Sequence, residues 1–341
     1  MSEYAIDLRF SNNRSGIGRD ARYFHSALKC LIPNIVELST LNQTREKKRM
    51  PDYAWFRSQL GFPNQIDTSG TKYLFQPHVW HMQPSISTRR IIRIHDIFPI
   101  TNPEWFRRTS IRAYTRGFMS IKAQDLILAD SEFTANEILN FRDDLKVEVL
   151  YCQTPKVADY ACDGCQSCEN IKLPEKFFLC VNTIEPRKNY PNLIKAWGKV
   201  LDDYLDVQLL ILGRKGWKCR DEIRLIRRSK SVVWISDACD KVIAEAYSRA
   251  LFSINPSLGE GFNYPTLESK VFACRTLASN IAVNRELNVD SISFDPLLLE
   301  DIAYSISRGL GVLATNPSSF DDVECKFQDD LETILLRNGI L

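Results

Sequence analysis

The sequence has no uninterrupted apolar stretch of about 18 residues, the length that a membrane-spanning helix requires. It begins without the basic-then-apolar pattern of a secretory leader. Neither charge sign is in clear excess, because 44 Lys and Arg residues stand against 42 Asp and Glu residues. These absences argue against an integral membrane protein, a secreted protein and a nucleic-acid-binding protein, and they predict a globular protein of the cytoplasm.

Disulfide pairing is not indicated by the cysteines. Ten Cys residues are present, and some lie inside apolar runs, such as Cys180, which predicts free thiols in a reducing compartment. Cys162, Cys165 and Cys168 have C-x2-C-x2-C spacing, so their thiolates could hold structural zinc or an iron–sulfur cluster. Cys152 or Cys180 would then supply a fourth ligand. The sequence lacks a matching second C-x2-C pair, so a thiol-rich linker without a ligand is the alternative.

Basic residues gather in the first half of the chain. Residues 1–150 hold 21 Lys and Arg against 16 Asp and Glu, a net charge of +5, and the remainder carries −3. Within that half, residues 103–122 have the spacing of a helix with an apolar stripe and a face of arginines, namely Arg107, Arg108, Arg112 and Arg116. Such a face could contact an anionic membrane surface. A helix packed on the core with a solvated outer face is the alternative.

The length of 341 residues predicts two domains, because one hydrophobic core rarely serves so long a chain. Apolar strand-like runs alternate with amphipathic helix-like stretches, and this alternation starts again in the second half. The pattern predicts an α/β fold with two doubly wound, Rossmann-like domains. We expect an N-terminal domain at 1–151, a Cys-rich linker at 152–174, a C-terminal domain at 175–320 and a helical tail at 321–341.

Residues 251–280 combine a strand pattern, a Gly-Glu-Gly turn centred on Glu260, and a helix that begins near Pro265 and carries Glu268. In a parallel sheet such turns line the ligand site, and the helix N-terminus offers unpaired N–H groups to an anion. We therefore expect the two carboxylates to flank a ligand-binding turn. An ordinary strand–helix connection with solvated acids is the alternative.

A second strand-to-helix turn carries two cations. Arg187 and Lys188 follow the apolar run that starts at Phe177 and precede a helix with Pro191 near its start. Both positive charges and the positive end of the helix dipole act on one small volume, which predicts a site for a pyrophosphate-type anion. A solvated basic turn is the alternative.

Two features of the first half also suit a ligand. Gly16 and Gly18 follow the first predicted strand, and glycines at such a turn let backbone N–H groups approach a phosphate or sugar closely. His95 ends another predicted strand, where a parallel sheet delivers side chains to its ligand. A plain tight turn and a structural histidine are the respective alternatives.

Together these segments resemble family four of the nucleotide-sugar-dependent glycosyltransferases, which have the GT-B fold. The matching segments run in family order over almost the whole chain: GIGR (16–19), HDIFPITNPEWF (95–106), ADSEFTANEI (129–138), NTIEPRKNYPNLIKAW (182–197), LLILGRKGW (209–217) and EGFNYPTLES (260–269). The resemblance implies two Rossmann-like domains that face a cleft, with a C-terminal helix returning towards the first domain.

The resemblance also implies roles for individual residues. Arg187 and Lys188 would bind the donor diphosphate and stabilise the charge that develops as the glycosidic bond breaks. Glu268 would accept hydrogen bonds from the ribose hydroxyls, Glu260 would lie beside the donor sugar, and His95 would face the sugar. The other implied donor-binding residues are Gly16, Gly18, Gly213, Phe262, Asn263 and Tyr264.

The implied enzyme retains the anomeric configuration and needs no divalent metal and no other cofactor. The absence of an Asp-x-Asp motif agrees with this, because two cations and helix N-termini can take the place of a metal at the leaving diphosphate. We favour front-face attack, in which the leaving phosphate takes the acceptor proton. The alternative, a double displacement, needs a nucleophile on the opposite face of the sugar.

The sequence departs from the family pattern at two places. Asn263 stands where the family commonly has the second glycine of Gly-Phe-Gly-Leu-Pro, and Asn tolerates positive φ better than most residues. Residues 273–276 replace a Gly-Thr-Pro-Val-type turn. The donor loop is expected to keep its shape, but these changes leave the identity of the donor sugar open.

We interpret the sequence as a retaining hexosyltransferase that moves a sugar from a nucleoside-diphosphate sugar to a glycan or lipid-linked acceptor in surface polysaccharide synthesis. GIGR and HDIFPITNPEWF look most like the mannosyltransferase-type members, which suggests GDP-mannose as donor. The basic first domain suggests a peripheral position at the inner face of the cell membrane. One alternative is a GT-B-fold nucleotide-sugar isomerase of the 2-epimerase type, and another is a non-catalytic sugar-nucleotide-binding scaffold.

Overall fold

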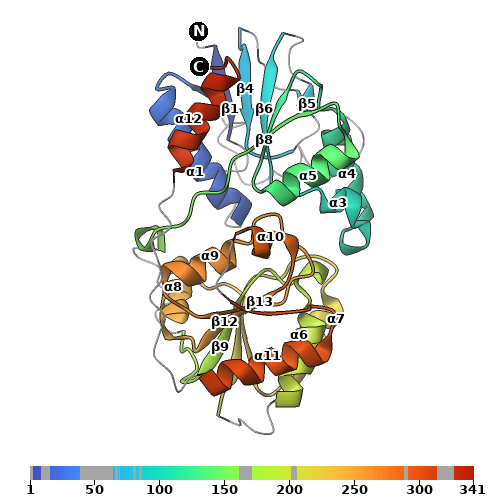
Figure 1. Ribbon diagram of the computed structural model, residues 1–341, viewed down its shortest axis with the longest axis vertical. Coiled ribbons are helices and arrows are strands. Elements are labelled where there is room, and N and C mark those ends of the chain that lie inside the picture. The colour runs from blue at the N-terminus through green and yellow to red at the C-terminus, as the bar shows by residue number, and fades with distance from the viewer. Residues whose placement is uncertain are drawn as a thin grey trace, which may run out of the picture. The chain divides into compact units, whose positions relative to one another are not determined.

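The computed structural model describes residues 3–8, 16–38, 64–65, 68, 70–79, 82–83, 87–160, 171–200, 206–287, 291–312 and 326–341. They fall into two compact units (Figure 1). Unit 1 comprises Met1–Gln153 together with Cys325–Leu341, and unit 2 comprises Thr154–Glu324. The cysteine group with metal-ligand spacing, Cys162, Cys165 and Cys168, lies outside the described residues. Among the helices that are described, none has the length and apolar character needed to cross a bilayer.

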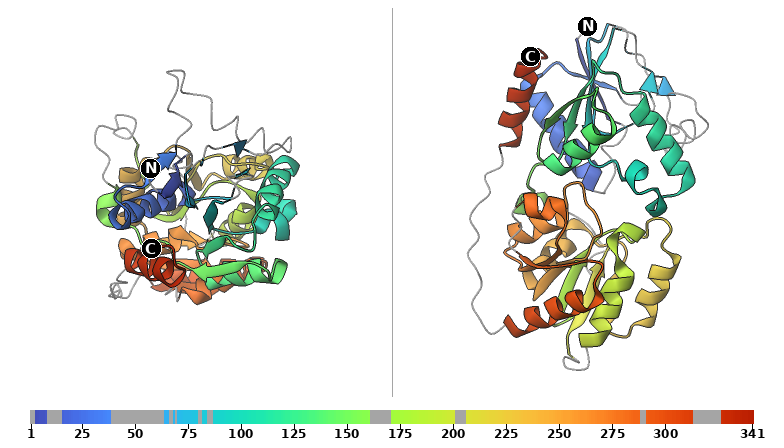
Figure 2. Two further views of the ribbon diagram at one scale, coloured as in Figure 1. Left: turned by 90° about the horizontal axis from the view of Figure 1, so that it is seen from above. Right: turned by 45° about the vertical axis from the view of Figure 1, so that its right-hand side comes forward.

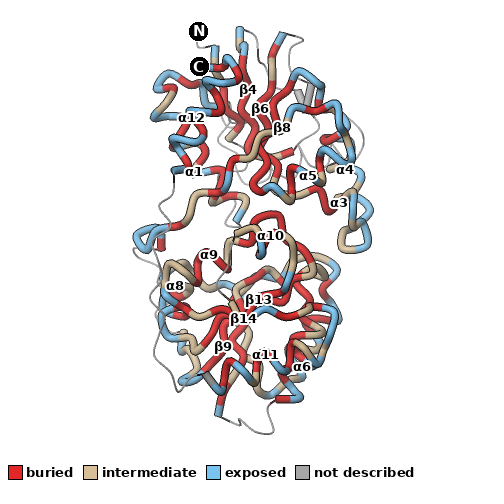
Figure 3. Tube along the Cα trace, in the orientation of Figure 1, coloured by how far each residue is buried: buried red, intermediate tan, exposed pale blue. Residues whose placement is uncertain are grey.

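Unit 1 is built on a six-stranded parallel sheet with the order β2-β1-β4-β6-β7-β8. Its strands are β1 Tyr4–Asp7, β2 Val36–Leu38, β4 Tyr73–Gln76, β6 Arg89–Ile94, β7 Leu126–Ala129 and β8 Lys146–Val149. Two short strands, β3 Asn64–Gln65 and β5 Met82–Gln83, form a separate parallel pair. Every residue of β4 and β7 is buried (Figure 3), as expected for inner strands of a parallel sheet covered on both faces.

The helices of unit 1 are α1 Gly16–Leu31, α3 Phe98–Thr101, η1 Pro103–Trp105, α4 Arg108–Met119, α5 Glu132–Phe141 and α12 Phe327–Arg337. The single helix expected over 103–122 is divided, because Phe106 and Arg107 are extended between η1 and α4. Trp105 packs edge-on against Phe98 with ring centroids 5.4 Å apart, which fixes η1 as a separate turn.

The C-terminal helix α12 lies beside α1 (Figures 1 and 2). Phe327 and Leu331 are buried in the same core cluster as Phe24 of α1. The chain end is also fastened to the sheet, because the Tyr4 hydroxyl donates to the carbonyl of Ile340 at 2.7 Å. The expectation of a C-terminal helix that returns to the first domain is therefore confirmed.

Unit 2 is built on a second six-stranded parallel sheet, with the order β11-β10-β9-β12-β13-β14. Its strands are β9 Phe177–Val181, β10 Gln208–Leu212, β11 Val232–Ile235, β12 Phe252–Asn255, β13 Thr276–Ser279 and β14 Ser291–Phe294. Its helical elements are η2 Val157–Tyr160, η4 Pro186–Lys188, α6 Tyr190–Val200, α7 Arg220–Arg228, α8 Asp240–Arg249, α9 Tyr264–Val271, α10 Ala282–Glu286 and α11 Leu299–Val312.

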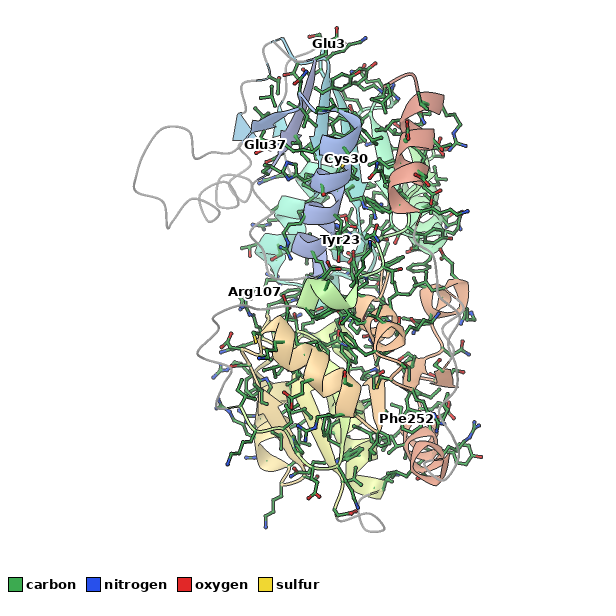
Figure 4. All side chains as sticks on the ribbon, turned by 90° about the vertical axis from the view of Figure 1, so that its left-hand side faces the viewer. Glu3, Tyr23, Cys30, Glu37, Arg107 and Phe252 are labelled. Atoms are coloured by element: carbon green, nitrogen blue, oxygen red, sulfur yellow. The ribbon has the colours of Figure 1, made fainter. Side chains whose placement is uncertain are left out.

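Strand β9 shows how unit 2 buries both faces of its sheet. Phe178 packs on one face, against Trp197 of α6 and against Phe252 of β12, the last of which is labelled in Figure 4. Its neighbour Phe177 packs on the other face, in a cluster with Tyr247 of α8. Because successive side chains of a strand point to opposite faces, the sheet is covered on both sides, and the predicted doubly wound architecture is confirmed.

The strand order of unit 2 reverses between β9 and β12. From β9 the chain winds outward through β10 and β11, and then returns to place β12 on the other side of β9. In open α/β sheets, ligands bind outside the carboxyl ends of the strands at this topological switch point. The turns that follow β9 and β12 are therefore the first place to look for a functional site.

Candidate functional site

The two turns at the switch point carry the cations and the carboxylates expected from the sequence. The turn after β9 contains Arg187 and Lys188, and the turn after β12 contains Glu260. A backbone hydrogen bond of 2.8 Å, from Leu258 N–H to the carbonyl of Arg187, joins the two turns. Side chains that are more than 70 residues apart in sequence are thereby held in one cluster.

Glu260 bridges both cations. Its Oε2 accepts from Arg187 Nη1 at 2.5 Å, and its Oε1 accepts from Lys188 Nζ at 2.5 Å. Burial alone would raise the pKa of the Glu260 carboxyl, but Arg187 and Lys188 outweigh burial and lower that pKa to about 2. Glu260 is therefore ionised at neutral pH and occupies the place between the two positive groups.

A second carboxylate balances the cluster. Glu185 is 2% exposed, and its Oε1 accepts from Arg187 Nη2 at 3.0 Å. Arg187 also donates to the carbonyl of Gly259 at 2.8 Å. Burial lowers the pKa of Lys188, and Glu260 opposes that effect. Two cations held this way can bind an arriving diphosphate once the ligand replaces Glu260 as their partner.

The loop before α9 turns through a left-handed residue. Asn263 has φ 67° and ψ 60°, so the expectation of positive φ at this position is confirmed. Its side-chain oxygen accepts from Asn255 Nδ2 at 2.7 Å, and its Nδ2 donates to Asn284 Oδ1 at 2.7 Å. The Asn263 side chain is thus held inside unit 2. Asn263 would therefore meet a ligand through its backbone rather than through its side chain.

Glu268 lies on α9 and is 7% exposed. Its Oε2 accepts a hydrogen bond of 3.1 Å from the hydroxyl of Tyr247, which belongs to α8. Glu268 and Glu260 therefore lie on either side of the loop before α9, as the sequence pattern indicates, but in different surroundings. Glu260 is paired with cations, whereas Glu268 accepts a hydrogen bond from a neutral donor, the hydroxyl of Tyr247.

Gly213 is required by the packing of the turn after β10. A Cβ atom at this position would lie 1.8 Å from the carbonyl oxygen of Asn182, which follows β9. A Cβ atom at Gly216 would lie 2.7 Å from the carbonyl oxygen of Ile184. The carbonyl of Gly213 accepts from the indole N–H of Trp234 at 2.9 Å. This glycine therefore lets the turn after β10 lie directly against the turn that carries Arg187.

Unit 1 places His95 between two buried carboxylates. Its Nδ1 lies 3.3 Å from Asp130 Oδ2, and its Nε2 lies 3.7 Å from Asp20 Oδ2. Burial lowers the pKa of His95, but the hydrogen bond to Asp130 and the charge of Asp20 outweigh burial, so the pKa is raised. Gly16 and Gly18 lie in the first turn of α1 rather than in a separate turn before it, and Asp20 follows them on the same helix, so the two glycines and His95 belong to one region of unit 1.

The group Asp20, His95 and Cys152 offers three ligand atoms within 4.8 Å of one another, the composition of a metal site. Arg93 already supplies a cation there: its Nε donates to Asp20 at 3.0 Å and its Nη2 lies 3.3 Å from Cys152 Sγ. A buried guanidinium repels a dication, so these residues do not fit a metal ion.

Sequence reasoning missed several polar residues of the switch point, namely Asn182, Glu185, Asn255 and Asn284. Each lies at or just beyond the end of a buried strand or in the helix that follows. Such positions border the ligand site of a parallel sheet, and this is the sequence signal by which they could have been found. Asn182 is 7% exposed, and its Nδ2 has no hydrogen-bond partner within the described ranges. The sequence gives no indication of which of these side chains turn inward.

The chain is similar to known proteins both in sequence and in fold. Residues 167–297, which include both switch-point turns, match the family described as Glycosyl transferases group 1. The chain is 25% identical over 247 residues to the serotype-specific mannosyltransferase WbdA of Escherichia coli, a match that covers 65% of this chain and 30% of WbdA. It is 25% identical over 264 residues to the O-antigen chain mannosyltransferase RfbU of Salmonella typhimurium, covering 75% and 69% respectively. The chain thus spans less than a third of the length of WbdA.

Two solved structures share the fold. Sucrose-phosphate synthase from Thermosynechococcus elongatus matches with a TM-score of 0.64 at 16% identity, covering 91% of this chain and 90% of the synthase. The UDP-forming α,α-trehalose-phosphate synthase from Burkholderia xenovorans matches with a TM-score of 0.55 at 13% identity, covering 79% and 71%. Residues 167–297 thus resemble the group 1 glycosyltransferases in sequence, and the chain as a whole has the two-domain GT-B fold.

Proposed function

We propose that unit 2 binds a nucleoside-diphosphate sugar and that the protein transfers this sugar to a glycan or lipid-linked acceptor. The observation that carries the proposal is the buried cluster in which Glu260 lies between Arg187 and Lys188 at the switch point. Such paired cations suit a diphosphate, which carries negative charge before and after the glycosidic bond breaks. They would stabilise the leaving group in the transition state without a divalent metal.

The proposed donor is GDP-mannose, and the proposed product is a surface polysaccharide. The relatives support this choice, because WbdA and RfbU are both described as mannosyltransferases and RfbU is described as acting on the O-antigen chain. Glu268 would bind the ribose hydroxyls of the nucleotide. The backbone of residues 262–264 would contact the sugar and the phosphate.

We propose transfer with retention by front-face attack, in which a leaving phosphate oxygen takes the acceptor proton. Front-face attack needs no protein nucleophile on the opposite face of the sugar, whereas a double displacement does. Phosphate deprotonation of the acceptor requires no further carboxylate.

We further propose that unit 1 contacts the inner face of the cell membrane through the start of α4. Arg107, Arg108 and Arg112 are exposed there, and α4 itself contains no acidic residue. Basic helices of this kind bind anionic lipid headgroups. Arg108→Glu with Arg112→Glu should abolish cosedimentation with vesicles containing phosphatidylglycerol. The pair Arg228→Glu and Lys230→Glu, exposed in unit 2, is the control.

The transfer reaction is tested by incubating the protein with GDP-mannose and mannose-containing oligosaccharide acceptors in the presence of EDTA. The proposal predicts acceptor-dependent release of GDP and a new linkage of retained α-configuration by NMR. Conversion of the nucleotide sugar into an epimer without acceptor would instead establish the isomerase alternative. Binding of GDP-mannose without turnover on any acceptor would favour the scaffold.

A further inference from the structure

The side chain of Tyr247, on α8, contacts the side chain of Glu268, on α9. Tyr247 is 1% exposed, and its hydroxyl lies 3.1 Å from Glu268 Oε2 and 3.2 Å from the carbonyl oxygen of Pro265. The hydroxyl has one proton to donate, and a carboxylate is a stronger acceptor than a carbonyl oxygen. The geometry therefore ties one oxygen of Glu268 to a fixed point in the core.

The ring of Tyr247 is itself fixed by its neighbours. Phe272, which follows α9, stacks on it with ring centroids 5.7 Å apart and an interplanar angle of 4°. Tyr160 of η2 packs edge-on against Phe272, with centroids 5.0 Å apart. These three rings form a continuous aromatic column, and a ring packed on its face has little freedom to move its hydroxyl.

Tyr247 also keeps its proton. Burial raises the pKa of its hydroxyl well above 10, and the nearby carboxylate of Glu268 raises it further. The hydroxyl is therefore a permanent hydrogen-bond donor over the working pH range of a protein. A carboxylate held at one oxygen has a defined plane, and this plane determines which directions its remaining lone pairs can serve.

We propose that Tyr247 is a positioning residue that orients the Glu268 carboxylate towards the ribose hydroxyls of the donor nucleotide. The proposal rests on the proposed function of Glu268. It assigns a role to Tyr247, a residue of α8 that would not itself touch the donor. The competing explanation is purely structural, with the Tyr247 hydroxyl serving the buried carbonyl of Pro265.

The test compares GDP with 2′,3′-dideoxy-GDP, which lacks both ribose hydroxyls, by calorimetric titration. The wild type should bind GDP at least about tenfold more tightly than the dideoxy analogue, because hydrogen bonds to a charged group are strong. Tyr247→Phe keeps the stacked ring and should lower this ratio roughly threefold to tenfold while leaving the affinity for the dideoxy analogue unchanged. A purely structural role would weaken both ligands together or neither.

Two further variants complete the experiment. Tyr190→Phe removes another fully buried hydroxyl of unit 2, one that donates to the carbonyl of Asn182, and it should leave the ratio at the wild-type value. Adding Tyr247→Phe to Glu268→Gln should change the ratio no further, because the hydroxyl acts through that carboxylate.

Three outcomes of the titrations would overturn either this inference or the proposed function, and they can be told apart. An unchanged ratio in Tyr247→Phe, with wild-type discrimination intact, overturns the positioning role and leaves the proposed function standing. A wild type that binds both nucleotides equally overturns the ribose role of Glu268 and with it this inference. A wild type that binds neither nucleotide overturns the proposed function itself.

Discussion

At the scale of single residues, buried charged side chains of this protein are paired with side chains of opposite charge. Arg90 and Arg93 lie in the central strand β6 and are 1% and 0% exposed, yet each forms a paired contact with a carboxylate, Asp125 and Asp20 respectively. Hydropathy could not predict this, because three arginines in a strand indicate a solvated edge rather than a central position. The partner carboxylates come from α1 and from the turn before β7, and no local sequence pattern relates them to β6.

His95 gives a prediction for the pH dependence of the free energy of unfolding. The groups that face His95 are Asp20 from α1, Asp130 after β7, Arg93 from β6 and His78 after β4, whose pKa is lowered to about 3 by burial, so that it is neutral. Because the folded pKa of His95 is raised, its stabilisation is fully present below its unfolded pKa of about 6.5 and is lost as pH rises through the folded value.

His95→Gln should therefore reduce the free energy of unfolding by about 1 kcal/mol or more below about pH 6.5, and by less at higher pH. Denaturant unfolding of both proteins from pH 5.5 to 9 measures the difference. A difference that is constant over this range, or that grows with pH, would contradict the raised pKa of His95. Cysteine oxidation is avoided by keeping a reductant present throughout.

At the scale of elements, the sequence predicted the alternation of strands and helices, the two turns that carry Arg187 and Glu260, and the left-handed turn residue, because each depends on a local pattern. Asn263 was recognisable from its place in the loop motif before α9. Its hydrogen bonds to Asn255 and Asn284 were not, since these residues belong to β12 and α10 and meet only in the folded unit. The division of the expected helix at 103–122 also depends on a tertiary contact, the packing of Trp105 on Phe98.

A matched pair of glycines tests the packing of the turn after β10. Gly213→Ala would place a methyl group 1.8 Å from a carbonyl oxygen, so it should destabilise unit 2 by several kcal/mol or displace the turn that carries Arg187. Gly198→Ala, on α6 with nothing within 4 Å of its Cβ, should instead stabilise the protein by about 0.5–1 kcal/mol. Equal melting temperatures for the two variants would contradict the close approach of Gly213 to the carbonyl oxygen of Asn182.

At the scale of the whole molecule, the chain builds two units that repeat one architecture and uses its last helix to complete the first. The tail expected at 321–341 contains α12, and α12 packs on the core of unit 1. The sequence alone could not show this, because the apolar face of α12 is compatible with either unit. The resemblance to a family supplied that expectation.

Because α12 packs on the core of unit 1, a substitution in its buried face should lower the stability of unit 1 and leave the nucleotide affinity of unit 2 unchanged. Leu331→Ala removes a side chain that is 0% exposed and should lower the free energy of unfolding by about 2–5 kcal/mol. Leu336→Ala, on the same helix and 55% exposed, should change it by less than about 0.5 kcal/mol. At temperatures where both variants are folded, GDP should bind each with wild-type affinity. A loss of affinity in Leu331→Ala alone would show that α12 acts on unit 2.

The central claim is that the cations at the switch point bind the diphosphate of the donor, and calorimetric titration of GDP and guanosine tests it most directly. The wild type should bind GDP at least about tenfold more tightly than guanosine, because only GDP can replace Glu260 between Arg187 and Lys188. Lys188→Ala should remove most of this preference, whereas Lys195→Ala, an exposed lysine on α6, should keep it. The same preference for GDP in Lys188→Ala as in the wild type would contradict the account.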